Sequence, residues 1–484
     1  MIPSNLNNLI IPRTLKTPTK PETMKTNNIN KSSYSPLSQR GAGGESWLGV
    51  GLLTLKSLWS RRKRNVWLFL ELILVAILCW AVLDPVIVSI YDKSLPLGYD
   101  KDRLCLVTLD NMDNKKRSKE ENNECLSGLK QKLMHDFPEI ERMANSRGYL
   151  PTTYTYGSTT FYNDTVVSPE TEVNVSIMGS SPGNPIFSTF GIKVIAGDLT
   201  IAELDSGLWS KDGYLISRST AEQYFGSPEE AVGKTLHKVD WHTGAIDVNL
   251  GRKILGVIEN VKIKNFSRNR NIIIECADYH EYIWEGSLSL IVRLKEGESA
   301  EKFRDKIADR IRDGYGSGHL ELTKVQTMSD LNKEREVTFG YTEVVQTYSI
   351  LAVLFLANLC LGVIGTFWLQ TKQRRGEVGI MRSFGATRGG IVRLILSEAT
   401  MLTTASFIIG CFIYLQYALK EGLYLGILTG LIDEGTTWVS DFSQHFIITS
   451  VIVYAVMLTT VLIGAYIPAR NLSRIPPVDA LRVS

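Results

Sequence analysis

The sequence has few of the residues from which most enzyme and metal sites are built. Its 484 residues include six cysteines and six histidines. No cysteine spacing matches a zinc site or a disulfide framework. His237 and His242 are five residues apart, which suits neither one helix face nor one strand face, so they predict no metal site. No Ser/His/Asp cluster and no paired-carboxylate cluster stands out in the sequence. We therefore expect no catalytic residues, no metal and no cofactor.

A nucleotide-binding motif is also missing. The segment AVGKTL contains Gly-Lys-Thr, but a P-loop needs another glycine five residues before Gly233, where this chain has Pro228. This segment is interpreted as a turn that leads into a strand. Walker B and ABC signature sequences are absent as well, so any ATP hydrolysis is expected on another chain.

The chain has only a small excess of positive over negative charge. The formal net charge is +3, which is too small to predict nucleic-acid binding. The basic residues lie instead beside apolar runs, in clusters at 61–64, 372–393 and 470–482. By the positive-inside rule these clusters place both termini and the central basic segment in the cytoplasm.

The chain does contain several long apolar runs. Four are long enough to cross a bilayer, which takes about 20 residues: 66–90, 344–370, 394–419 and 446–467. Glu71 and Asp84 lie near the two ends of the first run, where the favoured interpretation is that each snorkels to the interface. Gly362 and Gly365 could allow close helix approach in the second.

The segments next to these runs yield weaker expectations. Residues 1–45 are predicted to be a disordered tail, and translation could start at Met1 or Met24. Residues 46–65 predict an amphipathic helix on the inner membrane face. GLYLGILTGLI, within the extracytoplasmic loop 420–445, is too short to span and is expected to lie in the outer interface or to re-enter.

Residues 91–343 have no spanning run and are expected outside the cytoplasm as one α+β domain. Apolar spacing predicts two amphipathic helices, and β-branched and aromatic runs predict the strands. The helices are marked by Leu126, Leu129, Leu133 and Phe137, and by Ala300, Phe303, Ile307 and Ile311. A smaller lobe at about 179–285 is expected to be inserted between two strand–helix–strand arrangements.

The cysteines divide between these regions. Three lie in apolar runs and are interpreted as buried apolar side chains: Cys79, Cys360 and Cys411. Cys105, Cys125 and Cys276 fall in the domain outside, where a bond between Cys105 and Cys125 stays open.

The stretch Gln373–Ala399 is the most informative part of the chain. Val378, Met381 and Phe384 recur at i, i+3 and i+6, which predicts a short apolar stripe on a polar helix. Gly385 supplies a stop and Thr387 a fresh N-cap, so a second helix is expected to start at Arg388. A purely topological basic loop is the alternative, but it does not need an apolar stripe.

This stretch resembles a known family. RRGEVGIMRSFGAT followed by IVRLILSEA is similar to the cytoplasmic segment of FtsX-like and MacB-like permeases, the membrane subunits of type VII ATP-binding-cassette systems. LKSLWSRRKRN and PARNLSRIPPVDALRV resemble the opening and the ending of that family. Gly376, Gly389 and Gly390 depart from its usual pattern and predict a looser helix. PIFSTFGIKVIAGD, GYLISRSTAEQYFGSPEEAVGKTL and ILGVIENVKIKNF resemble the MacB-like periplasmic core domain.

The resemblance implies a fold and a role. It implies four transmembrane helices, with a porter-like βαβ domain that carries an inserted β-rich lobe between the first two. It also implies that residues 371–393 form a coupling helix that docks on a separate ATPase in the cytoplasm. The expected coupling residues are Glu377, Val378, Ile380, Met381, Arg382 and Phe384.

The resemblance further implies a non-catalytic permease subunit of the inner membrane. It would pair as a homo- or heterodimer with an FtsX-like permease and transmit ATPase-driven motion to its outside domain. A periplasmic adaptor or outer-membrane partner stays open. So does the process: export of drugs or peptides, lipoprotein extraction, control of cell-wall hydrolases at division, or sensing of antimicrobial peptides. Two other classes compete with this hypothesis. One is a membrane receptor that works without an ATPase, which the coupling stripe disfavours. The other is an extracytoplasmic enzyme, which the lack of a catalytic cluster disfavours.

Overall fold

A computed structural model describes residues 62–476 except 114, 116, 147–149, 154–156, 239–250, 277–287 and 427–436. The predicted tail, the predicted interfacial helix up to residue 61 and most of the GLYLGILTGLI segment lie outside the described residues.

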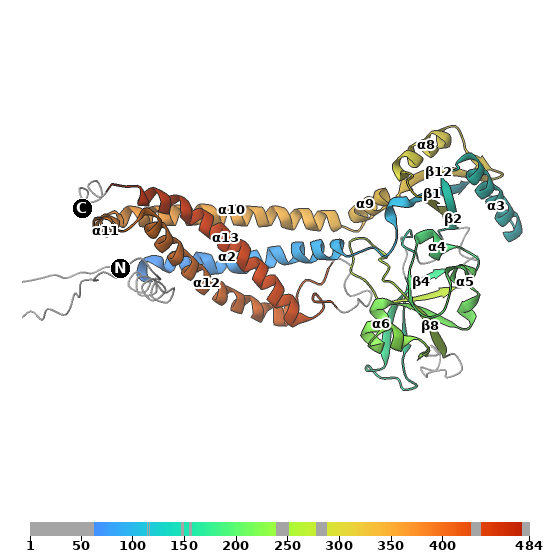
Figure 1. The fold of residues 1–484 in the computed structure, drawn as a ribbon, viewed down its shortest axis with the longest axis horizontal. Helices are drawn as coiled ribbons and strands as arrows, with labels where there is room; N and C mark the ends of the chain where they lie inside the picture. The colour runs from blue at the N-terminus through green and yellow to red at the C-terminus, as the bar shows by residue number, and fades with distance from the viewer. Residues whose placement is uncertain are drawn as a thin grey trace, which may run out of the picture. The chain divides into compact units, whose positions relative to one another are not determined.

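Four long helices pack alongside one another (Figure 1). Each contains a stretch long and apolar enough to cross a membrane. They are α2 (Arg62–Ser94), α10 (Tyr341–Gln373), α12 (Arg388–Glu421) and α13 (Phe442–Ser473).

Regular spacing of apolar residues explains how these helices pack. The buried positions of α13 recur every fourth residue, which keeps them on one helix face: Val453, Met457, Val461, Ala465 and Ala469. Trp80 of α2 is fully buried and stacks on Tyr414 of α12 and Phe446 of α13, with ring centroids 4.3 and 5.3 Å away. One large aromatic side chain thus joins three helices.

Glycines allow the closest approaches between helices. A Cβ at Gly410 of α12 would lie 2.8 Å from the Ala76 side chain of α2. A Cβ at Gly362 of α10 would meet the Glu71 carboxylate at 2.1 Å, so this glycine makes room for an acidic side chain of α2. Gly365, the other glycine expected at a close contact, has nothing within 4 Å of a Cβ position.

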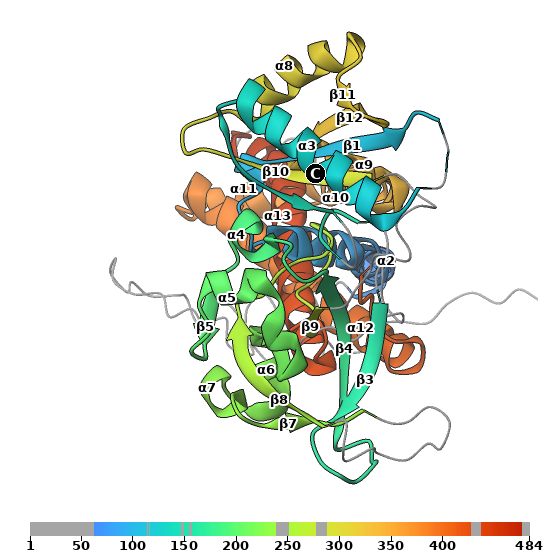
Figure 2. The same cartoon turned by 90° about the vertical axis from the view of Figure 1, so that its right-hand side faces the viewer.

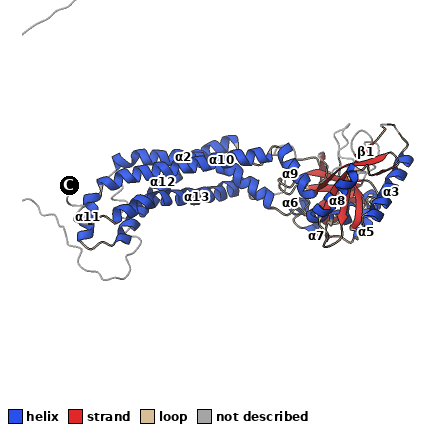
Figure 3. Ribbon diagram, turned by 90° about the horizontal axis from the view of Figure 1, so that it is seen from above, coloured by secondary structure: helices blue, strands red, loops and turns tan. Residues whose placement is uncertain are grey.

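The chain between α2 and α10 forms an α+β domain that holds the strands of the described chain (Figure 3). Its first sheet has the order β11-β12-β1-β10-β2, with antiparallel pairing throughout. The strands are β1 (Leu104–Asn111), β2 (Ile140–Asn145), β10 (Leu288–Leu294), β11 (Gly316–Ser317) and β12 (Leu320–Thr327). Two helices share a core with this sheet, α3 (Lys119–Asp136) and α8 (Ala300–Arg312).

The second sheet has the order β3-β4-β9-β6-β8-β5, and β7 pairs with β8 (Figure 2). The strands are β3 (Gly157–Tyr162), β4 (Glu172–Ser180), β5 (Val194–Ala196), β6 (Gly213–Ser217), β7 (Thr235–Leu236), β8 (Arg252–Ile258) and β9 (Ile272–Cys276). The helices of this lobe are α4 (Ile186–Phe190), α5 (Ile201–Ser206), α6 (Arg218–Phe225) and α7 (Pro228–Ala231). Two 3₁₀ turns complete the domain, η1 (Lys101–Arg103) and η2 (Leu208–Lys211).

The two sheets share one apolar core. Successive side chains of a strand point to opposite faces. On β1, Leu104 and Leu106 therefore join the core shared with the second sheet, whereas Cys105 and Val107 pack toward α3 and α8. Helix α9 (Met328–Thr338), which the sequence analysis did not predict, also enters the shared core through Met328 and Leu331.

The predicted fold class is confirmed: four membrane-spanning candidates, with an α+β domain between the first two. The expected start of the inserted lobe near 179 falls inside a strand of that lobe. Residues 176–180 pair in parallel with β9, and β3 forms a hairpin with β4, so the second sheet begins at Gly157. The strands were recognisable by composition, but their sheet depends on pairing with β9, about a hundred residues later in the chain.

Two further expectations can be compared with the structure. AVGKTL does lead into a strand, because α7 ends at Ala231, Gly233 has a φ of +85° and β7 begins at Thr235.

All six cysteines lie in described parts of the chain and are free, so Cys105 and Cys125 are not bonded to each other.

Candidate functional site

The turn between α10 and α12 carries a short helix, α11 (Arg375–Ser383). A Schellman motif ends this helix: the Ala386 N–H donates to Met381 O, and the Gly385 N–H donates to Arg382 O, each at 3.0 Å. The motif needs a left-handed residue, and Gly385 provides it with a φ of +94°. The predicted stop is therefore confirmed.

Helix α12 begins where the sequence predicts it. Thr387 is the N-cap residue, and its hydroxyl accepts a hydrogen bond from the Gly390 N–H at 3.1 Å. Only four residues separate α11 from Arg388. Because both sides of this connection are capped, its backbone has a defined conformation.

A buried ion pair joins the α10 end of this turn to α12. The Arg374 guanidinium donates to both carboxylate oxygens of Glu398, at 2.6 and 2.9 Å. The Arg374 and Glu398 side chains are 6% and 7% exposed. A bidentate pair of this kind fixes direction as well as distance. It therefore holds the start of α11 in a set position on α12.

A second polar link joins α11 to the end of α13. Arg382 donates to the backbone oxygens of Ile475 at 2.7 Å and of Ser473 at 3.4 Å. These oxygens lie at the C-terminal end of α13, where carbonyls lack partners within the helix. Arg382 thus anchors α11 at a second point.

The apolar residues of α11 divide into two groups. Val378 is 6% exposed and belongs to the core of the helix bundle. Ile380, Met381 and Phe384 are 51%, 37% and 88% exposed. We call these three residues the apolar patch. Glu377 lies beside it, half exposed, with its carboxylate 3.4 Å from the Arg374 guanidinium.

Sequence reasoning therefore found the patch but not its supports. Val378 and Arg382 were expected to be coupling residues, yet both side chains contact the rest of this chain. Arg374 and Glu398 were not selected at all. A signal existed, because a carboxylate inside a spanning run calls for a cation, and Arg374 lies in the neighbouring basic cluster.

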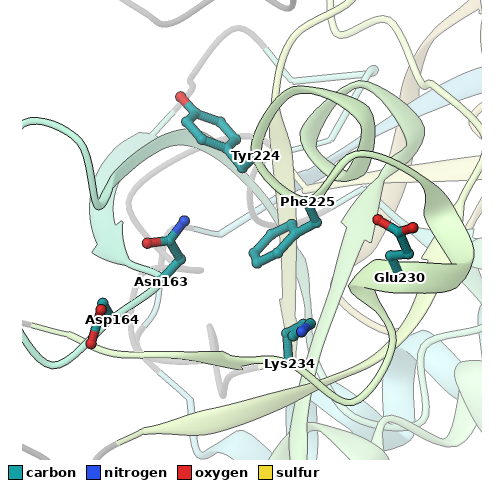
Figure 4. A pocket seen from close by; sticks show the side chains of 6 residues that line it. All are labelled: Asn163, Asp164, Tyr224, Phe225, Glu230 and Lys234. Atoms are coloured by element: carbon teal, nitrogen blue, oxygen red, sulfur yellow. The ribbon is translucent and has the colours of Figure 1, made fainter.

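In the described part of the globular domain, one pocket carries several polar groups, but they do not converge on one point. An open pocket of about 520 Å³ lies in the second lobe (Figure 4). It is lined by Asn163, Asp164, Tyr224, Phe225, Glu230 and Lys234. Figure 4 shows the Phe225 ring in the middle of the set, with the charged side chains spread around it rather than aimed at one point. Among the described residues, no group of three or more His, Cys, Asp and Glu could hold a metal.

Comparison with known families agrees with this architecture. Residues 102–310 match the MacB-like periplasmic core domain, and residues 349–477 match the FtsX-like permease C-terminal family. The first match lies in the α+β domain, and the second covers nearly all of α10, α11, α12 and α13.

Several curated proteins are similar to this chain. The macrolide export ATP-binding/permease protein MacB of Burkholderia lata is 29% identical over 193 residues, which is 37% of this chain and 26% of that protein. A probable export ATP-binding/permease protein of Pseudomonas fluorescens is 23% identical over 299 residues, 61% of this chain and 41% of that protein. An uncharacterized ABC transporter permease of Methanocaldococcus jannaschii is 24% identical over 239 residues, 48% of this chain and 54% of that protein.

The matched part of the chain thus spans between about a quarter and about half of the length of these relatives. Two family models nevertheless match in the order in which the domain and the helices occur. Taken with the four apolar helices and the domain between the first two, these matches show that the chain belongs to the FtsX-like and MacB-like permeases of ABC transporters.

Proposed function

We propose that this chain is a non-catalytic permease subunit that passes ATPase-driven motion across the membrane to its periplasmic core domain. In this proposal α11 is the coupling helix, and ATP is bound and hydrolysed by a partner chain in the cytoplasm. The termini and α11 lie on the cytoplasmic side of the inner membrane, and two permease chains, alike or different, assemble around a twofold axis.

The observation that carries the proposal is the exposed apolar patch on an anchored helix. An apolar cluster in an aqueous turn is costly unless something covers it. Covering a side chain such as Phe384 or Met381 contributes about 1.5–3 kcal/mol. The Arg374–Glu398 pair and Arg382 hold α11 before any partner arrives, so little ordering entropy is lost on docking.

The structure narrows the set of proposed contact residues. Ile380, Met381 and Phe384 would enter the partner, and Glu377 would lie at the rim of the contact. Val378 and Arg382 are positioning residues in this proposal, because they hold α11 on the bundle.

The names of the relatives are the basis for proposing which process this motion serves. Two of them are named as export ATP-binding/permease proteins, so we propose export or extraction of an amphiphilic molecule. No feature of the described residues favours control of cell-wall hydrolases or peptide sensing over this reading.

The test is to measure ATPase capture by full-length chain carrying Phe384→Asp. This substitution removes the most exposed member of the patch and places a charge in an apolar contact. A loss of about 4 kcal/mol corresponds to nearly three decades in affinity. We expect the variant to insert and fold but to lose the ATPase during purification in mild detergent, together with ATP-dependent activity.

Two controls accompany this experiment. Leu208→Asp changes an equally apolar, 66% exposed residue of the globular domain and should leave capture intact. Arg388→Ala tests a purely topological role of the basic turn and should cost much less than Phe384→Asp. Stoichiometric ATPase with Phe384→Asp would show that this patch is not the coupling surface.

A further inference from the structure

A second buried polar cluster lies in the helix bundle, away from the coupling helix. Asp84 of α2 is 1% exposed, and His445 and Thr449 of α13 are fully buried. His445 Nε2 lies 2.7 Å from Asp84 Oδ1, and the Thr449 hydroxyl donates to the same oxygen at 3.3 Å. Asp84 therefore does not snorkel to the interface, as its position in the sequence suggested. Its neighbours on α13 take the place of water.

The hydrogen-bond partners of His445 determine how many protons the pair holds. Nδ1 lies 2.9 Å from Val439 O, and a carbonyl can only accept, so Nδ1 carries a proton. Nε2 faces a carboxylate, which requires a second proton between the two groups. The Thr449 hydroxyl and the Tyr424 N–H also donate to Asp84, the latter at 3.4 Å. Three groups thus lie within hydrogen-bond distance of one buried carboxyl group, which gives it the partners that water would otherwise supply.

Gaining or losing a proton would be costly at this site. Without the shared proton, two acceptors would face each other at 2.7 Å and the cluster would carry a buried negative charge. With one more proton, the imidazolium would face a neutral acid, and its positive charge would be unpaired. Among the described residues, the phenols of Tyr414 and Tyr424 are the ionisable groups of other elements beside Asp84.

The pair also joins segments that are far apart in the chain. Tyr424 follows the end of α12, and Val439 lies just before α13, so both ends of the α12–α13 connection contact the cluster. Trp438 packs edge-on against the His445 ring, with centroids 5.4 Å apart, and also contacts Tyr91 of α2. Helix α2 then continues to Ser94, a few residues before the globular domain begins.

We propose that Asp84 and His445 form a buried, hydrogen-bonded clamp that joins α2 to the first turns of α13. Through this clamp a displacement of α13 reaches α2, and with it the chain that enters the globular domain. Buried ion pairs rarely add net stability over apolar packing, but they enforce one register between elements. The clamp is independent of the proposed ATPase contact, and either can fail alone.

Nitrogen-15 spectra of labelled histidine in the full-length chain in detergent test the clamp directly. The signals of His445 are assigned by their loss in His445→Gln. We expect Nδ1 of His445 to carry a proton, as its contact with Val439 O requires, and Nε2 to show the shift of a nitrogen hydrogen-bonded to a carboxyl group. A His445 ring without a proton on Nδ1, or with Nε2 unaffected by Asp84→Leu, would overturn the proposal.

A variant cycle tests the pairing by a second route. Asp84→Leu and His445→Leu should each lower the apparent melting temperature by about 10 °C, because each leaves a buried polar side chain without its hydrogen-bond partner. The double variant should recover more than half of that loss. If the melting-temperature losses of the two single variants simply add in the double variant, the result contradicts the clamp. Glu71→Leu is the matched control on the same helix and should change little, because the Glu71 carboxylate lies beside Gly362, which has no side chain to pair with it.

Discussion

Individual lysines of the globular domain show how strongly burial acts on charge in this protein. Lys262 and Lys264 are at most 1% exposed. The Lys262 ammonium donates to the backbone oxygens of Asp92 at 2.5 Å and of Asn265 at 2.8 Å. Burial lowers the pKa of Lys262 to about 8. Burial, with a smaller contribution from Arg335, lowers the pKa of Lys264 to about 7.

The low pKa of Lys264 predicts that replacing this lysine increases the stability of the folded chain, by an amount that depends on pH. The unfolded chain binds a proton at this lysine below about pH 10.4, but the folded chain does so only below about pH 7. The lysine therefore costs stability as the pH falls from about 10 to 7, and the cost persists below pH 7. Lys264→Met should raise the melting temperature of the full chain, by about 2–4 °C per kcal/mol regained, and more at pH 7 than at pH 9.5.

The prediction has a matched control in Lys295→Met, which replaces an exposed lysine and should shift the melting temperature little at either pH. Thr153 O, which Lys264 contacts at 3.5 Å, would keep its bond from Arg335, so the methionine leaves this acceptor paired. An unchanged or lower melting temperature at pH 7 would mean that Lys264 contributes more through its contacts than it costs through its charge.

Residue-level contacts were the hardest to predict from the sequence. Asp84, Glu71 and Glu398 all stand out as carboxylates in apolar runs. The partner of Asp84, however, lies 361 residues later, and the partner of Glu398 lies between α10 and α11, 24 residues earlier. Which cation meets which carboxylate depends on how the helices pack, and the pattern along one helix does not contain that information.

At the scale of elements, α11 is the part that the sequence described best. Spacing predicts its stripe, and the residue types at Gly385 and Thr387 predict its stop and the start of α12. The spacing also placed Val378 on the same surface as Phe384, and here it misled. Val378 lies within α11, where the bundle covers it, whereas Phe384 is the C-cap residue beyond the last helical turn and is 88% exposed. The bundle covers one face of this nine-residue helix, so a partner can contact only the residues on the other face and at its end.

The supports of α11 can be tested by amide hydrogen exchange. Arg374→Met leaves Glu398 buried without its cation, which costs about 3–5 kcal/mol when one partner of such a pair is removed. We expect exchange over residues 375–385 to become faster, because α11 loses its anchor on α12. The double variant Arg374→Met/Glu398→Met should restore slow exchange, since no charge is then unpaired.

The control for this measurement is Arg375→Met, which removes the neighbouring, exposed arginine and should leave exchange unchanged. If Arg374→Met exchanges no faster than Arg375→Met, the pair does not position α11.

For the whole molecule, the order of its parts followed from the sequence, whereas the boundary between its lobes did not. Four apolar runs and three basic clusters are enough to place a domain between the first two helices. The two sheets of that domain share a core through β1 and α9, and β3 and β4 belong to the second sheet by pairing with a distant strand. Such long-range pairing is not visible in the alternation of apolar residues along one strand.

The central claim is that the apolar patch of α11 contacts an ATPase. The most direct measurement replaces Phe384 in the full chain with a photoreactive phenylalanine analogue, irradiates native membranes and identifies the crosslinked protein by mass spectrometry. The same analogue at Phe412, an exposed residue within a membrane-spanning helix, is the matched control and should yield lipid adducts or a second permease chain. We predict that position 384 captures an ABC ATPase and that ATP changes the yield. Capture of any other protein at position 384, or none while the permease is active, would contradict the account.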